Sequence, residues 1–496
     1  MTNRPSIRSR IPGALVSFLL AAVFVLFFGE CNTPLGPRIG SDNAMYLTMG
    51  TALAQGYAPY SDIFDHKGPL LFILQMLPQL IAGGYSLTAV YWQEVVFLFA
   101  GLRIVSAMAR RSGMRGELLL QLIYLGALGA CMDGGNLTEE YAATFILAGL
   151  YAAQCVFDRD DEAQPKDMLL PAAVMGAAAM LAFLTRANNA LGLCGMTAGI
   201  ALTLLFGSRF AALGACAAGF LAGCAAAGLP VLAWLAYHGA ISDAVYGSII
   251  HNMMYAETGS ASRVHALFFT PYGYTALLFA AVAALGALRA YMRSRRAALP
   301  LGMLLTAALA GMSCFISHKF YSHYLMVLAP IAVMGAVQIL AVLPAGRLSS
   351  RRTLQIYTCV VLACVVLLGA RANHNRLKER EGLDQFIADA QELYALVPEE
   401  DRDSFMAYRV EPKWYVAAQA LPCMRFYFLQ EILGQADPAV MDEVANEFET
   451  NPPQWVVIFY NREFGPPYDE RVAQVFESRY TFVDAKGQYQ LLRLTP

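Results

Sequence analysis

The chain has 496 residues, of which 57% are hydrophobic and only 15% are charged. Soluble globular proteins have roughly 45–50% apolar and about 25% charged residues, so this composition excludes an ordinary soluble protein and places most of the chain in lipid. The net charge of −2 gives no indication of a nucleic-acid or polyacidic partner, and the ten scattered cysteines contain no CxxC pair that would predict a disulfide framework or a metal site.

Many apolar segments approach the ~20 residues that a helix needs to cross a bilayer. About eleven membrane helices are predicted, over residues 11–29, 86–109, 117–131, 140–157, 168–185, 188–206, 210–237, 272–292, 298–317, 322–344 and 353–370. No small-residue cleavage site follows the first segment, so we expect a retained helix rather than a signal peptide.

The basic residues indicate the orientation of these helices, because Lys and Arg in short loops stay in the cytoplasm. They cluster at residues 4–10, 110–115, 209, 293–296 and 347–352. Placing all of them inside gives a multi-pass membrane protein with a cytoplasmic N-terminus and an extracytoplasmic C-terminal domain.

The apolar stretch 69–83 does not fit this count, because a full crossing there would turn the 110–115 cluster outward. It is short and is interrupted by Pro78. We therefore expect a re-entrant or interfacial helix within a long first outer loop, residues 30–85.

Beyond residue 370 the composition becomes that of a soluble domain. Residues 1–370 are thus predicted to form a transmembrane domain and residues 371–496 a small extracytoplasmic α/β domain. Its expected elements are a helix at 383–396, strands at 405–409 and 425–429, a helix at 438–448, a strand at 455–460, a helix at 470–477, and a hairpin at 480–494 that turns at Lys486-Gly487.

Acidic and basic residues collect in the loops assigned to the outer side. The first loop contains Asp42, Asp65 and Lys67. Asp42 opens a predicted amphipathic helix, so one interpretation is an N-cap and the other is a catalytic carboxylate.

Three later clusters fall on the same side: Glu139 and Glu140; Arg186 and Asn188; and Lys319, His323 and Tyr324. The glutamates are also compatible with simple helix starts, and the two cations with side chains that snorkel to the membrane surface. Because charges near a membrane are costly unless they are paired or hydrated, their coincidence with the acidic first loop favours one shared site.

The order of these residues resembles the GT-C glycosyltransferases, more narrowly the bacterial branch related to protein mannosyltransferases and the lipid A aminoarabinose transferase (glycosyltransferase family 39-like). The resemblance covers about residues 1–370 and rests on Asp42, Tyr46, Gly56, Pro59-Tyr60, Asp65, Lys67-Gly68-Pro69-Leu70, residues 136–140, Arg186, Asn188, His323-Tyr324 and Pro330. Relatives often have Asp-Glu where this chain has Asp42-Asn43, and Lys-Pro-Pro-Leu where it has Lys67-Gly68-Pro69-Leu70.

The resemblance implies a GT-C fold and the transfer of a sugar from a polyprenyl-phosphate donor to a lipid, glycan or protein acceptor of the cell envelope. It implies an inverting single displacement with Asp42 as the base, a task that typically contributes 10²–10⁴-fold. The expected substrate-binding residues are Lys67, Asp65, Glu139, Glu140, Arg186, Asn188, Lys319, His323 and Tyr324.

No cofactor is required by this scheme, because Arg and Lys can stabilise the leaving phosphate; a divalent cation stays open, since other branches of the superfamily use one. The alternative function is a multi-helix transporter or lipid flippase for envelope glycan precursors. Against it, the two halves of the chain show no matched pair of broken helices.

Overall fold

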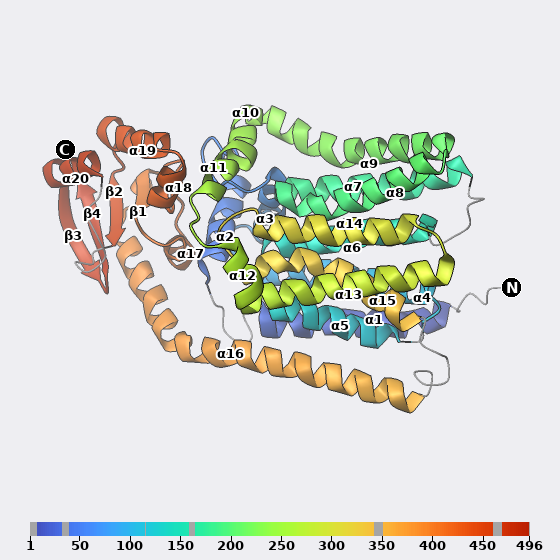
Figure 1. Ribbon diagram of the computed structural model, residues 1–496. Helices are drawn as coiled ribbons and strands as arrows, with labels where there is room; N and C mark the ends of the chain where they lie inside the picture. Colours follow the sequence, from blue (N-terminus) through green and yellow to red (C-terminus); the bar gives the residue numbers. More distant parts are fainter. Residues whose placement is uncertain are drawn as a thin grey trace. The chain divides into compact units, whose positions relative to one another are not determined.

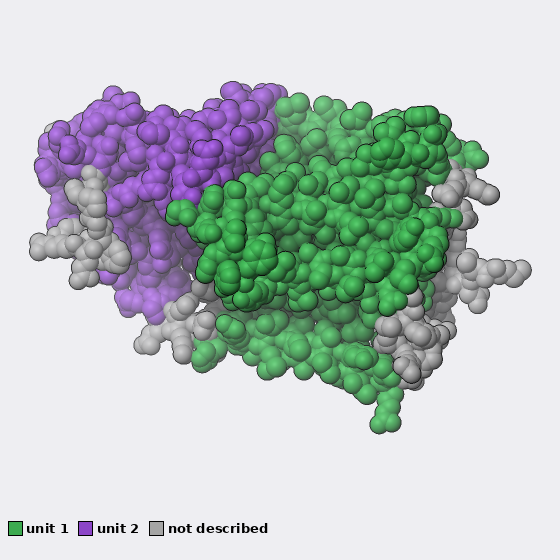
Figure 2. Space-filling model, in the orientation of Figure 1, with its two compact units in different colours: residues 1–29, 91–233, 260–374 green, residues 30–90, 234–259, 375–496 purple. Residues whose placement is uncertain are grey.

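The computed structural model describes residues 7–31, 39–114, 116–157, 164–341, 351–459 and 469–495. The chain forms two compact units, each assembled from separate stretches of sequence (Figure 2). The first unit comprises residues 1–29, 91–233 and 260–374, and the second comprises residues 30–90, 234–259 and 375–496. The predicted division into domains 1–370 and 371–496 stays a prediction.

The first unit is a helical bundle (Figure 1). Its helices are α1 (Ile7–Phe28), α4 (Leu87–Arg111), α5 (Glu117–Cys131), α6 (Thr138–Phe157), α7 (Pro165–Thr185), η2 (Ala187–Ala190), α8 (Leu191–Phe206), α9 (Phe210–Tyr237), α12 (Arg263–Phe269), α13 (Pro271–Ser294), α14 (Ala298–Phe315), η4 (Ser322–Leu328) and α15 (Ala329–Ala341). Residues 87–90 of α4 and 234–237 of α9 are assigned to the second unit.

The apolar helices confirm the prediction of a polytopic helical membrane protein. Within the described residues, nine helices are long and apolar enough to cross a membrane. Three shorter apolar helices accompany them: Gly13–Phe28, Pro69–Ala82 and Glu117–Cys131. Two of these correspond to predicted spans, and Pro69–Ala82 corresponds to the predicted re-entrant or interfacial helix.

Glycines allow close approach of helix backbones in the bundle. A Cβ atom added to Gly176 of α7 would lie 1.9 Å from the carbonyl oxygen of Phe220 in α9. A Cβ atom on Gly286 of α13 would lie 2.3 Å from Cα of Gly335 in α15. Such small-residue contacts are what packs helices together where lipid removes the hydrophobic drive for association.

The long helix α16 (Arg351–Ala395) corrects one prediction. It runs for 45 residues through positions 371–382, where the sequence suggested a break between a membrane helix and a separate helix at 383–396. The polar stretch has no proline, and eight of its twelve residues are Arg, Glu, Lys, Leu or Ala, all good helix formers, so a change of composition there does not end the helix.

The second unit combines the first loop, a short helical segment and the C-terminal part of the chain. It contains α2 (Ser41–Ala54), α3 (Pro69–Ala82), α10 (Ile241–Val245), the π-helical turn η3 (Tyr246–His251), α11 (Asn252–Glu257), η5 (Glu399–Ser404), α17 (Lys413–Ala418), α18 (Gln430–Ala436), α19 (Ala439–Thr450) and α20 (Glu470–Arg479). Its strands are β1 (Phe405–Tyr408), β2 (Trp455–Phe459), β3 (Tyr480–Lys486) and β4 (Tyr489–Leu494).

The strands form one sheet in the order β1-β2-β4-β3. Strands β1 and β2 are parallel, whereas β4 pairs antiparallel with both β2 and β3. The predicted hairpin, with its turn at Lys486-Gly487, is therefore present, and Gly487 has the positive φ of 54° that this turn uses. The strand predicted at 425–429 is wrong: this segment has no strand, and the main chain of Arg425 bonds to the first loop instead.

Candidate functional site

The residues predicted to form the site fall into two groups, one in each unit. Asp42, Asp65 and Lys67 belong to the second unit, and the remaining seven belong to the first. Each group is described by itself.

Asp42 is the second residue of α2. The N-cap position is occupied by Gly40, and no side chain caps the helix. Residues 43–53 are all buried, so α2 is a buried helix rather than an amphipathic one, while Asp42 itself is only partly buried. Among the described side chains none forms a hydrogen bond or ion pair with the Asp42 carboxylate. The N-cap interpretation therefore does not hold.

Asp65, His66 and Lys67 form a buried chain of polar contacts. The main-chain N–H of Lys67 donates to Oδ1 of Asp65 at 3.2 Å, and Nδ1 of His66 lies 3.2 Å from the same oxygen. Nζ of Lys67 is 3.0 Å from Nε2 of His66 and 3.8 Å from Oδ1 of Asp65. Nε2 of a neutral His66 that carries its proton on Nδ1 accepts from Lys67, whereas Nδ1 lies near Oδ1 of Asp65 without hydrogen-bond geometry.

Electrostatics link Asp65 to Asp42. Burial raises the pKa of Asp65 above its ordinary value of 3.8; the positive charge of Lys67 offsets part of this, and the negative charge of Asp42 adds to it. Oδ2 of Asp65 is buried and accepts no hydrogen bond in the described structure. The two carboxylates are thus close enough to influence each other, although they lie on different segments.

Two neighbouring side chains donate hydrogen bonds to the main chain of His66 and Lys67. The hydroxyl of buried Tyr60 donates to the carbonyl oxygen of Lys67 at 2.7 Å, and Nδ2 of Asn252 in α11 donates to that of His66 at 3.2 Å. The ring of His251 lies 6.1 Å from that of His66. Neither histidine is among the predicted site residues, although His66 stands between two of them in the sequence.

In the first unit, Arg186 is the centre of the polar group. Its Nη1 donates to Oε1 of Glu139 at 2.8 Å, its Nη2 donates to the Tyr324 hydroxyl at 3.3 Å, and its guanidinium lies 4.4 Å from the centre of the Tyr324 ring. Glu139 also accepts from the Thr138 hydroxyl at 2.6 Å. Arg186 and Glu139 are 6% and 2% exposed, so this is a buried ion pair that fixes the orientation of the guanidinium.

His323 extends this group. Its ring packs edge-on against Tyr324 at 4.8 Å and stacks on Tyr321 at 5.6 Å, and its Nδ1 lies 3.9 Å from Oδ2 of the exposed Asp133. Asn188 is half-buried in η2, two residues after Arg186. Lys319 is half-buried in the connection between α14 and η4.

Glu140 faces a different part of the structure from Glu139. Its Oε2 accepts the main-chain N–H of Asn136 at 2.9 Å, and Oε1 of Glu94 accepts the same N–H at 2.7 Å. Asn136 has φ of 54°, and its side-chain oxygen accepts from the Tyr141 hydroxyl at 2.6 Å. Glu140 therefore supports the turn before α6, together with Glu94, which is not among the predicted site residues.

No group of three or more His, Cys, Asp or Glu side chains in the described ranges is arranged to hold a metal ion. At Asp65 the charge that a cation would supply is provided by Lys67, and both ring nitrogens of His66 face a polar neighbour. The residues around Asp65 thus do not fit a metal ion.

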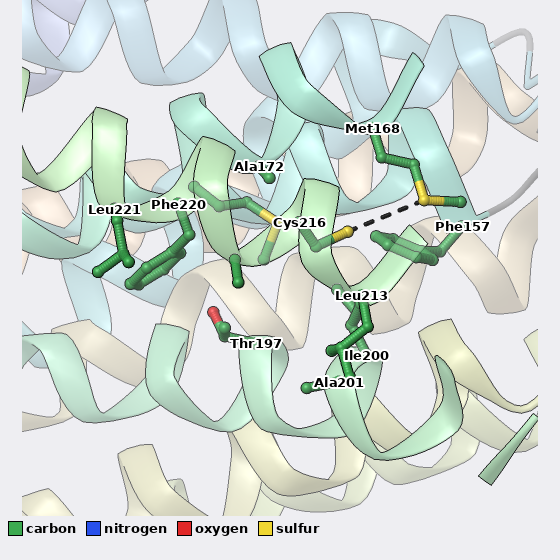
Figure 3. Close-up of a pocket in the computed structure, with 12 residues that line it drawn as sticks. Phe157, Met168, Ala172, Thr197, Ile200, Ala201, Leu213, Cys216, Phe220 and Leu221 are labelled. Atoms are coloured by element: carbon green, nitrogen blue, oxygen red, sulfur yellow. Dashed lines mark hydrogen bonds between the residues drawn. The ribbon is translucent and has the colours of Figure 1, made fainter. Parts of the chain in front are cut away.

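An apolar cavity of about 280 Å³ lies within the first unit, between the end of α6 and helices α7, α8 and α9 (Figure 3). Sulfur and carbon atoms form most of its wall, with Cys216 and Met168 directed at each other. The hydroxyl of Thr197 donates to the carbonyl oxygen of Leu193. A sugar needs several polar partners, so this cavity does not suit sugar transfer.

No family model matches the chain, and no curated protein matches it. Solved structures do. ArnT from Cupriavidus metallidurans bound to undecaprenyl phosphate aligns with a TM-score of 0.61 and 13% identity, over 98% of this chain and 98% of ArnT.

Two structures of the Archaeoglobus fulgidus oligosaccharyltransferase also align. One is tethered to an acceptor peptide containing the NVT sequon, with a TM-score of 0.54 and 11% identity over 96% of this chain and 73% of that one. Another, in complex with zinc and sulfate, has a TM-score of 0.51 and 12% identity over 95% and 72% of the two chains. Both the bundle and the C-terminal sheet are included in alignments of this extent, and the chain therefore has the GT-C fold that its sequence predicted.

Proposed function

We propose that this protein is a membrane glycosyltransferase that moves a sugar from a polyprenyl-phosphate donor to an acceptor on the extracytoplasmic face. The observation that carries the proposal is the alignment over nearly the full length of both chains with ArnT, which was solved with undecaprenyl phosphate. The same comparison extends to an oligosaccharyltransferase. The acceptor is a lipid, a glycan or a protein of the cell envelope.

The proposed reaction is a single displacement with inversion. A hydroxyl or amine of the acceptor forms a bond to the anomeric carbon, while the bond from that carbon to the phosphate oxygen breaks and the phosphate leaves with the electron pair. The acceptor proton passes to Asp42, whose carboxylate has no competing partner among the described side chains. A positioned base of this kind typically contributes 10²–10⁴-fold.

Negative charge that grows on the leaving phosphate requires cations. Lys67 is the proposed cation of the second unit, and Arg186 that of the first. Arg186 suits this role because Glu139 and Tyr324 orient its guanidinium, and a planar guanidinium binds phosphate through two donors. Lys319 and His323 are proposed to help bind the phosphate of the donor. Asp65 and His66 are proposed to position the ammonium group of Lys67.

Glu139 is proposed to orient the guanidinium of Arg186 rather than to bind the acceptor. Glu140 is proposed to stabilise the turn before α6. Asn188 and Tyr324 are proposed to line the donor site. No step requires a divalent cation.

The carrier's hydrocarbon chain has a suitable site in the first unit. A groove of about 420 Å³ lies among α12, α13 and α14, and Arg263 is its one charged lining residue in the described structure. Arg263 begins α12 and donates to the carbonyl oxygen of Ile316.

The proposed location is the bacterial inner membrane, with the N-terminus in the cytoplasm and the C-terminal domain outside. The positive-inside distribution of Lys and Arg supports this orientation.

The test uses a strain that lacks the gene, complemented with the wild type, Asp42→Asn or Asp62→Asn. Asp62 is an exposed carboxylate of the same loop that accepts the main-chain N–H of Ala58, and it provides the matched control. Mass spectrometry of lipid-linked saccharides and envelope glycans should show loss of the glycosylated product with Asp42→Asn alone, at equal protein in the membrane. A wild-type product level with Asp42→Asn would remove the proposed base, and solute uptake into reconstituted vesicles without any glycosylated product would replace transfer by transport.

A further inference from the structure

Arg425, in the C-terminal part of the chain, is hydrogen-bonded to the segment that precedes Asp65. The main-chain N–H of Phe64 donates to the carbonyl oxygen of Arg425 at 3.0 Å. In return, Nε of Arg425 donates to the carbonyl oxygen of Tyr60 at 2.7 Å. One residue of the C-terminal part thus binds both ends of the stretch 60–64, which directly precedes the buried Asp65, His66 and Lys67.

The side chain of Arg425 completes the contact. Its guanidinium lies 5.4 Å from the ring centre of Phe64 and 5.0 Å from that of Phe426, and these two rings are 4.9 Å apart. The guanidinium therefore packs against both rings of this aromatic pair, and its position is set by packing as well as by hydrogen bonds.

Two carboxylates from different segments meet the same guanidinium. Nη1 of Arg425 lies 3.4 Å from Oε1 of Glu443 in α19, and Nη2 lies 3.7 Å from Oδ1 of Asp243 in α10. Asp243 also accepts from the hydroxyl of Ser61 at 3.0 Å. Arg425 consequently joins three stretches that are far apart in sequence: the first loop, α10 and the C-terminal part of the chain.

The same C-terminal segment also supports α2. The hydroxyl of fully buried Tyr427 donates to the carbonyl oxygen of Met45, three residues after Asp42. The hydroxyl of Tyr85, at the end of the first loop, donates to the carbonyl oxygen of Ala420 at 2.8 Å. Residues 420–427 therefore contact the first loop at residue 45, at residues 60–64 and at residue 85.

We propose that residues 420–427 are a positioning element of the active site and that Arg425 is its central positioning residue. In this view the C-terminal domain is part of the catalytic apparatus and not a separate binding module. The physical reason is that loop residues give precise chemistry only when their backbone is held to within a fraction of an ångström, and that a misplacement of about 1 Å can cost 10²-fold in rate. The effect on catalysis rests on the function proposed above, whereas the anchoring of the first loop does not.

Hydrogen exchange of the purified full-length protein tests the anchoring without any substrate. Arg425→Ala should raise the exchange of amides in residues 58–68 at least about tenfold, while the amides of β1 to β4 keep their wild-type protection. Arg471→Ala is the matched control, because Arg471 is an arginine of the same C-terminal part whose partners Glu449 and Asp442 lie outside the first loop. It should leave the exchange of residues 58–68 unchanged.

Arg425→Lys gives a second, milder variant that retains the charge. A lysine cannot satisfy Tyr60, Glu443 and Asp243 together, since it lacks the fixed geometry of the guanidinium. We expect it to be folded and to show an intermediate rise in exchange over residues 58–68. If Arg425→Ala also raises the exchange of amides in β1 to β4, the variant is partly unfolded. The exchange of residues 58–68 in Arg425→Lys then decides whether Arg425 anchors the first loop.

Steady-state kinetics with the natural lipid-linked donor, in membranes from the complemented strain, test the effect on catalysis. Arg425→Lys should lower kcat at least about tenfold and change KM less than about threefold, because a displaced catalytic loop weakens the transition state more than substrate binding. Wild-type exchange and wild-type kcat in folded Arg425→Lys would overturn the proposal. Raised exchange over residues 58–68 in a protein whose wild type transfers no sugar would instead overturn the proposed function and keep the anchoring.

Discussion

The buried ion pair of the first unit allows a quantitative test. In Glu139→Gln the shape of the side chain is nearly kept, but the guanidinium of Arg186 loses its counter-charge. The side chains of Arg186 and Glu139 are only 7% and 3% exposed, and their charged atoms are 2.8 Å apart. Because water cannot replace the lost partner at such burial, we expect Glu139→Gln to cost about 3–5 kcal/mol of unfolding free energy.

The ion pair of Arg110 with Glu117 provides the comparison. It is equally short at 2.6 Å, but its side chains are 41% and 37% exposed, so Glu117→Gln should cost less than about 1 kcal/mol. Unfolding can be followed by tryptophan fluorescence in mixed micelles of increasing SDS content. The double variant Glu139→Gln/Arg186→Gln should lose less than the sum of its single variants, since it leaves no charge unpaired.

Equal losses of stability in Glu139→Gln and Glu117→Gln would refute this reasoning. Strict additivity in the double variant would also contradict it, because it would mean that the two charges do not interact in the folded protein.

Two further predictions concern the second unit. A Cβ atom on Gly50 of α2 would lie 2.3 Å from the main-chain oxygen of Gln75 in α3, so Gly50→Ala should lower the melting temperature by several degrees. Gly214→Ala is the control and should not lower it, because no atom lies within 4 Å of the added Cβ atom. Equal melting temperatures of the two variants would contradict the close crossing of α2 and α3. Burial lowers the pKa of His251 below its ordinary value of 6.5, so the folded protein favours the neutral ring. The unfolded chain binds the proton first as the pH falls below 6.5, and the free energy of unfolding should therefore decrease there by at most about 1.4 kcal/mol per pH unit. Melting curves between pH 7.5 and 5.5 should show a smaller slope for His251→Gln, and an unchanged slope would exclude this residue as the cause.

The membrane helices were predictable from the sequence to within a few residues. The span predicted at 210–237 is helix α9, and the span predicted at 272–292 is α13, Pro271–Ser294. A lipid-embedded segment must satisfy its own backbone hydrogen bonds and needs ~20 apolar residues, so local composition alone decides where such a helix lies. The strands at 405–408 and 455–459 were predicted for a similar reason, as short apolar runs with turn residues around them.

Local sequence patterns did not predict the structure where a residue has its partner far away in the chain. The segment 425–429 has the aromatic, apolar composition of a strand, yet the carbonyl oxygen of Arg425 accepts from Phe64 of the first loop and its side chain donates to Tyr60, 365 residues away. Likewise, two adjacent glutamates at the start of α6 look equivalent in the sequence, but Glu139 faces Arg186 and Glu140 faces Asn136.

The sequence by itself thus determined the class of protein, the course of its membrane helices and the segments that carry its charged residues. Only the tertiary structure decided which of those residues are paired and which are available: Arg186 with Glu139, Lys67 with His66, and Asp42 with no partner among the described side chains. The physical reason is that burial in lipid acts on each segment separately, whereas a hydrogen bond or an ion pair requires two segments to meet with their polar atoms about 3 Å apart, which spacing along the chain does not record.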